Sequence, residues 1–282
     1  MRTPITYYGG KQMLAKLIVS ILPKHKIYCE PYFGGGAVFF AKRKSYLEVI
    51  NDINHKLITF FTILRDDYKN LNRIISDTLH SEAIHKAAKD IYNGRAGTVS
   101  DLELAWSVWV VTNGSFGGNI HGGWKWCNGT AGSHSGIYLR GKREDLSEEI
   151  SERLKDVQIS CRKAIRVIID RDTDETVFYL DPPYAGFVQG HYSGFTIKDL
   201  FELLQVIQDM KGKFILSNFW SQTLRWHVAK NNWHTISITS LNKIANLGIR
   251  SQGKKKVKSK TEILVMNFIP EAANQYQIEF ND

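Results

Sequence analysis

A short apolar run that stops at two prolines constrains the fold of this chain more than any other feature. Residues 177–180 are Val-Phe-Tyr-Leu, which predicts a fully buried strand, and residues 181–184, Asp-Pro-Pro-Tyr, follow directly. Because proline cannot donate to a sheet ladder, the strand has to end there. In an open α/β sheet, ligands bind outside the carboxyl ends of the strands, so Asp181 and Tyr184 are expected at a binding edge.

The same four residues suit one kind of reaction. The exocyclic amine of a nucleobase is a weak nucleophile because its lone pair is delocalised into the ring. If the Asp181 carboxylate and the Pro182 carbonyl accepted its two N–H groups, they would draw the nitrogen towards tetrahedral geometry. The Tyr184 ring would meanwhile stack on a base taken out of the helix. Taken alone, Asp-Pro-Pro is more often a simple turn after a strand, so the remaining sequence has to decide.

A strand, glycine loop and helix are predicted near the N-terminus. The strand ends at Glu30, and residues 31–36, Pro-Tyr-Phe-Gly-Gly-Gly, lead into the helix, an arrangement typical of a site for a nucleotide-like cofactor. Asp52 ends the next predicted strand 18 positions after Gly34, and an acid that holds ribose hydroxyls is expected about 20 positions on. Phe39 stands where a dinucleotide site would need a third glycine, which favours a smaller adenosine cofactor. The alternative is that residues 31–36 form a simple turn that binds no cofactor.

The charge distribution indicates a polyanionic partner. The 282 residues carry a formal net charge of +9, and residues 241–260 hold seven Lys or Arg and no Asp or Glu. Nucleic acid is the first expectation and a membrane surface the second, with a solvated loop as the alternative. The three cysteines are far apart, and no apolar run reaches the ~18 residues of a membrane helix. We therefore expect no metal site and no membrane span, and a cytoplasmic (intracellular) protein that is a monomer or weak dimer.

A long segment of different composition separates two groups of predicted strands. Helices are predicted over residues 55–64, 71–92 and 102–112, and residues 113–141 then hold nine of the 22 glycines. Such a stretch predicts long surface loops or a hairpin that orders on a partner, and plain mobile loops are the alternative.

Strands that alternate with helices on both sides of this segment predict a doubly wound α/β sheet. We expect a catalytic domain formed by residues 1–55 and 156–282, with residues 56–155 as an inserted, mostly helical target-recognition domain.

Taken in order, these motifs resemble those of the Dam-like (D12 class) DNA adenine-N6 methyltransferases. Residues 7–11 are similar to the family's N-terminal Trp/Tyr-x-Gly-Gly-Lys motif, and residues 30–36 to its Glu-Pro-Phe-x-Gly-x-Gly loop. Residues 181–184 match its catalytic motif in every residue type. The resemblance covers nearly the whole chain apart from the details of the insertion, and the chain departs from the family at Lys163, where an acid is usual.

The resemblance implies a Rossmann-like, S-adenosyl-L-methionine-dependent methyltransferase that modifies the N6 atom of a flipped-out adenine at specific sites in double-stranded DNA, as in restriction–modification. It assigns catalysis to Asp181, Pro182, Pro183 and Tyr184, and cofactor binding to Tyr7, Gly9, Gly10, Lys11, Glu30, Tyr32, Phe33, Gly34, Gly36, Asp52 and Asp181.

Contact with nucleic acid is expected at Asn113, Lys125, Arg140, Lys254, Lys255, Lys256 and Lys258. Lysine and arginine contacts to phosphate position a protein on DNA without reading its sequence. Two alternatives stay open at this point. One is a cytosine-N4 or RNA-adenine methyltransferase of the same fold, and the other is a non-catalytic relative that only binds nucleic acid.

Overall fold

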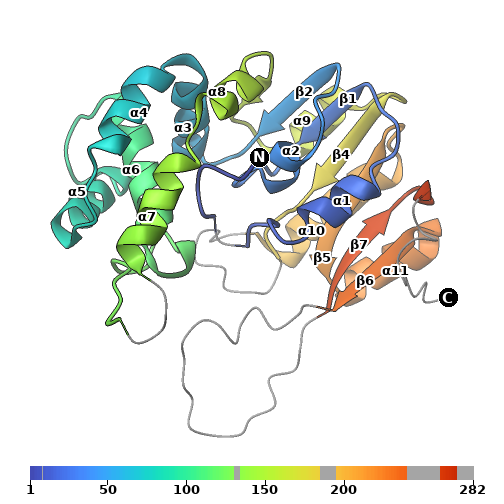
Figure 1. Ribbon diagram of the computed structural model, residues 1–282. Coiled ribbons are helices and arrows are strands. Elements are labelled where there is room, and N and C mark those ends of the chain that lie inside the picture. Colours follow the sequence, from blue (N-terminus) through green and yellow to red (C-terminus); the bar gives the residue numbers. More distant parts are fainter. Residues whose placement is uncertain (8, 130–133, 185–194, 240–260, 272–282) are drawn as a thin grey trace, which may run out of the picture.

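Seven strands form a single mixed sheet in the computed structural model, which describes residues 1–7, 9–129, 134–184, 195–239 and 261–271 (Figure 1). The order across the sheet is β3-β2-β1-β4-β5-β7-β6, and all neighbours are parallel except β7, which is antiparallel to β5 and β6. The strands are β1 (Ile27–Glu30), β2 (Leu47–Asn51), β3 (Gln158–Ser160), β4 (Thr176–Leu180), β5 (Lys213–Phe219), β6 (His234–Thr239) and β7 (Thr261–Met266).

Side chains of the central strands alternate between two buried faces. In β4, Phe178 and Leu180 pack on one face, and Tyr179 packs on the other. The first face is covered by α9 (Ala164–Arg171), α10 (Ile197–Gln208) and α11 (Gln222–Asn231), and the second by α1 (Ala15–Ser20) and α2 (Ala37–Ala41), among others. Strands buried on both faces are near-continuous apolar runs, as residues 177–180 are. The predicted doubly wound sheet is therefore confirmed.

The chain between β2 and β3 is helical and lies to one side of the sheet in Figure 1. A single cluster of buried side chains continues from the sheet into these helices, as at Phe33 and Phe61, whose ring centroids are 4.8 Å apart. The division into domains at residues 55 and 156 stays a prediction. The helices are α3 (His55–Asp66), α4 (Tyr68–Ser76), α5 (Glu82–Tyr92), α6 (Asp101–Gly114), the short 3₁₀ turn η1 (Phe116–Gly118), α7 (Ser135–Glu144) and α8 (Glu148–Leu154).

Two predicted boundaries in this region were wrong. The helix predicted over residues 71–92 is broken between α4 and α5, where the Thr78 hydroxyl donates to the Ile74 carbonyl and accepts from the Trp106 indole. Part of the glycine-rich stretch is α7, whose start is capped because the His134 ring accepts from the Ile137 amide. Side-chain bonds of this kind end and begin helices at points that apolar periodicity does not mark.

The strand order creates one crevice at the carboxyl edge of the sheet. From β1 the chain winds outward to β2 and β3, whereas from β4 it winds the other way to β5. Glu30 ends β1 and Asp181 follows β4, and these two strands are parallel neighbours. In doubly wound sheets ligands bind where the strand order reverses, so the fold predicts a ligand site between Glu30 and Asp181. Among the described residues, no helix is both long and apolar enough to cross a bilayer.

Candidate active site

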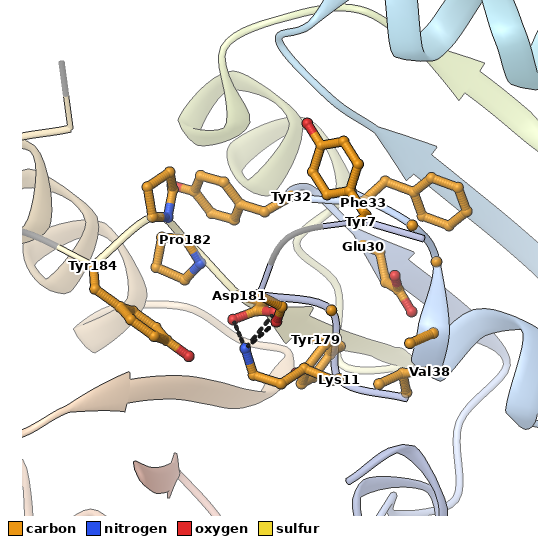
Figure 2. A pocket seen from close by; sticks show the side chains of 17 residues that line it. Tyr7, Lys11, Glu30, Tyr32, Phe33, Val38, Tyr179, Asp181, Pro182 and Tyr184 are labelled. Carbon is orange, nitrogen blue, oxygen red and sulfur yellow. Dashed lines mark hydrogen bonds and ion pairs between the residues drawn. The ribbon is translucent and has the colours of Figure 1, made fainter. Parts of the chain in front are cut away.

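The crevice between β1 and β4 is a cleft of about 540 Å³, including space open to solvent, and it is shown in Figure 2. Three segments distant in sequence line it: the N-terminal loop, the glycine loop with the start of α2, and the end of β4. All four predicted catalytic residues line this cleft, as do all the predicted cofactor residues except Asp52. The lining residues that the sequence did not single out are Gly35, Ala37, Val38 and Tyr179.

Lys11 and Asp181 face each other at the centre of the cleft (Figure 2). The Lys11 ammonium donates to both carboxylate oxygens of Asp181, at 2.8 and 2.9 Å, and to the Gly9 carbonyl at 3.2 Å. A second carboxylate, Glu262, lies 3.2 Å from the same nitrogen. The Lys11 side chain is only 6% exposed, so one buried cation is shared by two acids.

Burial and charge act in opposite directions on this group. Burial disfavours the charged form of Lys11, but the Asp181 and Glu262 carboxylates outweigh it and raise its pKa well above the usual range. Burial raises the pKa of Asp181, and the ammonium of Lys11 offsets only part of that effect. Lys11 is therefore held as a cation, and Asp181 is a stronger base than an exposed aspartate.

The N-terminal loop is fixed from behind by the inserted helices. The Asn113 side-chain oxygen accepts from the Thr6 amide and hydroxyl, both at 3.0 Å, and the Asn113 amide group donates to the Pro4 carbonyl at 3.3 Å. The Tyr138 hydroxyl lies 2.5 Å from that of Thr6. These contacts hold the loop whose residues Tyr7, Gly9, Gly10 and Lys11 line the cleft.

The glycine loop adopts backbone angles that other residues rarely adopt. Gly34 has φ +51° and Gly36 has φ +68°. A Cβ added to Gly36 would lie 2.5 Å from the Phe33 ring, so this turn needs glycine for both conformation and space. The backbone consequently borders the cleft with no side chain in the way.

Asp52 supports the glycine loop and does not line the cleft. Its carboxylate accepts from the Gly34 and Asn54 amides, each at 2.9 Å. The side chain is 3% exposed, and burial raises its pKa while these amide bonds lower it in part. Its predicted role at ribose hydroxyls stays a prediction.

Glu30 is a second buried acid at the cleft. It accepts from the Tyr28 hydroxyl at 2.5 Å, and burial raises its pKa to about 8. Glu30 and Asp181 both border the cleft, where a cationic ligand would stabilise their charged forms.

Glu262 contacts the predicted site residues Lys11 and Tyr184, and the sequence did not single it out. It lies near the start of β7, which begins at the carboxyl edge of the parallel strands because β7 is antiparallel to β5. Its Oε1 accepts from the Tyr184 hydroxyl at 2.6 Å and the Ser217 hydroxyl at 2.7 Å. The available signal was an acid directly before the apolar run Ile-Leu-Val-Met at residues 263–266.

The predicted nucleic-acid residues fall into three groups. Arg140 is exposed on α7, and Lys125 is partly buried with its ammonium 3.4 Å from the Tyr138 ring centroid. Asn113 is 1% exposed and bonded to the N-terminal loop, a position that disfavours direct contact with DNA. Lys254, Lys255, Lys256 and Lys258 lie outside the described residues.

Among the described residues, no group of three or more His, Cys, Asp or Glu side chains is gathered as a metal site requires. Lys163, at the position where the family usually has an acid, is exposed at the N-terminal end of α9.

A sheet of this order, a glycine loop after β1 and Asp-Pro-Pro-Tyr after β4 define a Rossmann-like methyltransferase. Its family follows from sequence comparison. The model of the D12 class N6 adenine-specific DNA methyltransferase family matches residues 7–98 and 128–246, so the chain belongs to that family. It is an adenine-specific DNA methyltransferase, and proteins of this class use S-adenosylmethionine.

Individual relatives cover most of the chain at low identity. The type II methyltransferase M1.LlaDCHI of Lactococcus lactis subsp. cremoris is 28% identical over 92% of this chain and 93% of its own. The DNA adenine methylase of Escherichia coli K12 is 23% identical over 81% and 87%. Among solved structures, the rRNA methyltransferase aviRa of Streptomyces viridochromogenes has a TM-score of 0.34 at 12% identity, over 93% of this chain and 87% of that one.

Proposed function

We propose that the cleft between β1 and β4 is the active site, where the methyl group of S-adenosylmethionine is transferred to N6 of an adenine in double-stranded DNA. The observation that carries this proposal is the juxtaposition of Asp181 with the glycine loop at the reversal of strand order. Membership of the family indicates that the substrate base is adenine, and the lining of the cleft indicates which residues would bind it.

The cleft suits a cationic adenosine cofactor. Glu30 and Asp181 present two carboxyl groups, and Gly34 and Gly36 form a backbone turn at the cleft where an added Cβ would meet the rings of Tyr7 and Phe33. Residues of the three segments would hold the cofactor, namely Tyr7, Gly9, Gly10, Lys11, Glu30, Tyr32, Phe33, Gly34 and Gly36, with Asp52 behind them. When bound, S-adenosylmethionine supplies a methyl group already activated by its sulfonium.

The residues after β4 would prepare the acceptor amine. The Asp181 carboxylate and the Pro182 carbonyl accept the two N–H groups of adenine, which frees the nitrogen lone pair, and Pro183 keeps the turn rigid. The Tyr184 ring stacks on the flipped base. As N6 gains the methyl group it loses one proton, and the Asp181 carboxylate is placed to accept it because burial raises the pKa of that group.

DNA would lie across the carboxyl edge of the sheet and α7. Arg140 is an exposed cation on α7, and the Lys125 ammonium lies over the ring of Tyr138 on the same helix. The relatives named as a type II methyltransferase and a DNA adenine methylase support methylation at a specific site. The expected monomer or weak dimer stays a prediction.

The test is methyl transfer from labelled S-adenosylmethionine to double-stranded DNA. Digestion of the product to nucleosides should give N6-methyladenine, whereas N4-methylcytosine, or transfer to RNA alone, would contradict the proposal. We expect D181A to lose at least about 100-fold in turnover. A fully active D181A enzyme would contradict the role proposed for Asp181. Calorimetry should show cofactor binding, and its absence would indicate a protein that only binds nucleic acid.

A further inference from the structure

The contacts of Glu262 connect two parts of the active site. Its Oε1 accepts from the Tyr184 hydroxyl at 2.6 Å and lies 3.2 Å from the Lys11 ammonium. The Glu262 side chain is 14% exposed. Burial opposes its ionisation, but Lys11 and the hydroxyls of Tyr184 and Ser217 lower its pKa overall. Glu262 is therefore a largely buried anion in contact with two residues that line the cleft.

Lys11 competes with the substrate amine for Asp181. Its ammonium donates to both oxygens of Asp181, so it takes one acceptor position on each oxygen and neutralises the carboxylate charge. The remaining positions can accept an adenine N–H, and they accept it more strongly if the ammonium moves away. A buried cation without a counter-ion is strongly disfavoured, so this movement needs another carboxylate within reach.

On this basis, and resting on the function proposed above, we propose that Glu262 is a positioning residue. It takes the Lys11 ammonium when Asp181 binds the adenine amino group, and it fixes the Tyr184 ring through the hydroxyl. The 3.2 Å contact shows that the second counter-ion is already in place.

Tyr184 gains its orientation from the same carboxylate. The ring packs edge-to-face on Phe219, with centroids 4.6 Å apart, and its hydroxyl is bonded to Glu262. Phe219 pairs with Glu262 across β5 and β7, so both contacts come from one cross-strand pair. Because the Tyr184 ring is already held by Phe219 and by its hydroxyl, it loses little conformational entropy when a base stacks on it.

The test compares E262Q with the wild-type enzyme. Glutamine keeps an oxygen for the Tyr184 and Ser217 hydroxyls and removes only the charge. We expect kcat/KM for DNA to fall about ten- to a hundredfold, whereas the Kd for S-adenosylmethionine changes less than about threefold. DNA with 2-aminopurine at the target position should report less base flipping. S217A, which removes another partner of the same oxygen, should change kcat/KM by less than about threefold.

A double-mutant cycle separates this role from general support of the fold. In a K11M background, E262Q should have little further effect on kcat/KM for DNA, because no ammonium remains to be transferred. An undiminished loss in K11M, or an E262Q enzyme equal to wild type, would overturn the inference. If E262Q fails to fold, the same cycle with E262D applies, since the shorter side chain moves the carboxylate away from Lys11. A wild-type enzyme that does not methylate adenine would instead contradict the proposed function.

Discussion

Lys11 and Asp181 lie 170 positions apart in sequence, and the lysine ammonium donates to both oxygens of the aspartate at 2.8 and 2.9 Å. This ion pair joins the N-terminal loop to the end of β4. The ammonium lowers the pKa of Asp181 against the effect of burial, which raises it. The same ammonium takes one acceptor position on each Asp181 oxygen, so Lys11 favours the carboxylate form of Asp181 and also competes for its oxygens with an incoming amine.

The first prediction concerns the pH dependence of K11M. Lys11 lowers the pKa of Asp181 against the effect of burial, so its loss should raise that pKa. Because the unprotonated carboxylate is the active form, the acid limb of kcat/KM should move to higher pH. Activity should be lost at a pH where the wild type is still active.

K16M is the matched control, since Lys16 is exposed on α1. Its pH profile should follow the wild type. A K11M profile that moves to lower pH, or does not move at all, would show that the ion pair does not control Asp181.

The second prediction uses two glycines with almost the same backbone angle. Gly36 has φ +68° and Gly94 has φ +70°, but a Cβ would meet the Phe33 ring at 2.5 Å only at Gly36. We expect G94A to reduce the free energy of unfolding by about 1–2 kcal/mol, and G36A by about 2–4 kcal/mol.

Urea unfolding measures both free energies. G36A should also weaken binding of S-adenosylmethionine in calorimetry, whereas G94A, which lies outside the cleft, should bind it normally. Equal stability losses in the two variants would show that the Phe33 contact relaxes without cost.

The third prediction concerns Arg140, which is exposed on α7. If it contacts a phosphate, R140A should weaken DNA binding for every sequence. It should also reduce the slope of log K against log salt concentration by about 1. R43A is the control, because Arg43 is exposed in the segment that leads into the amino end of β2. Fluorescence anisotropy measures the DNA affinity at several salt concentrations. An unchanged salt dependence in R140A would show that Arg140 does not contact the DNA.

The sequence predicted those parts of the site that local rules determine. Prolines stop β4, glycines allow the turn before α2, and alternation of apolar residues buries the strands, so the cleft and most of its lining could be located. The partners of those residues could not. Glu262 reaches Tyr184 because β7 is antiparallel and starts at the carboxyl edge, a relationship that no local pattern contains. For the same reason Asn113 looked available for DNA, although the N-terminal loop buries it.

The fourth prediction follows from Glu30, whose pKa is raised by burial from 4.5 to about 8. Between these two values the folded protein retains a proton that the unfolded chain releases. The contribution of Glu30 to stability is therefore fully present below about pH 4.5 and is lost as the pH rises towards 8. The expected slope is at most about 1.4 kcal/mol per pH unit.

E30Q cannot release this proton, so its free energy of unfolding should fall less steeply across the window. Unfolding in urea at pH 5.5 and 7.5 should show the wild type losing more stability than E30Q over that interval. E175Q, which alters an exposed carboxylate, should match the wild type. Parallel pH dependence in wild type and E30Q would mean that Glu30 is already ionised in the folded protein. The acid at the end of β1 would then carry a charge at neutral pH before any cationic ligand reaches the cleft.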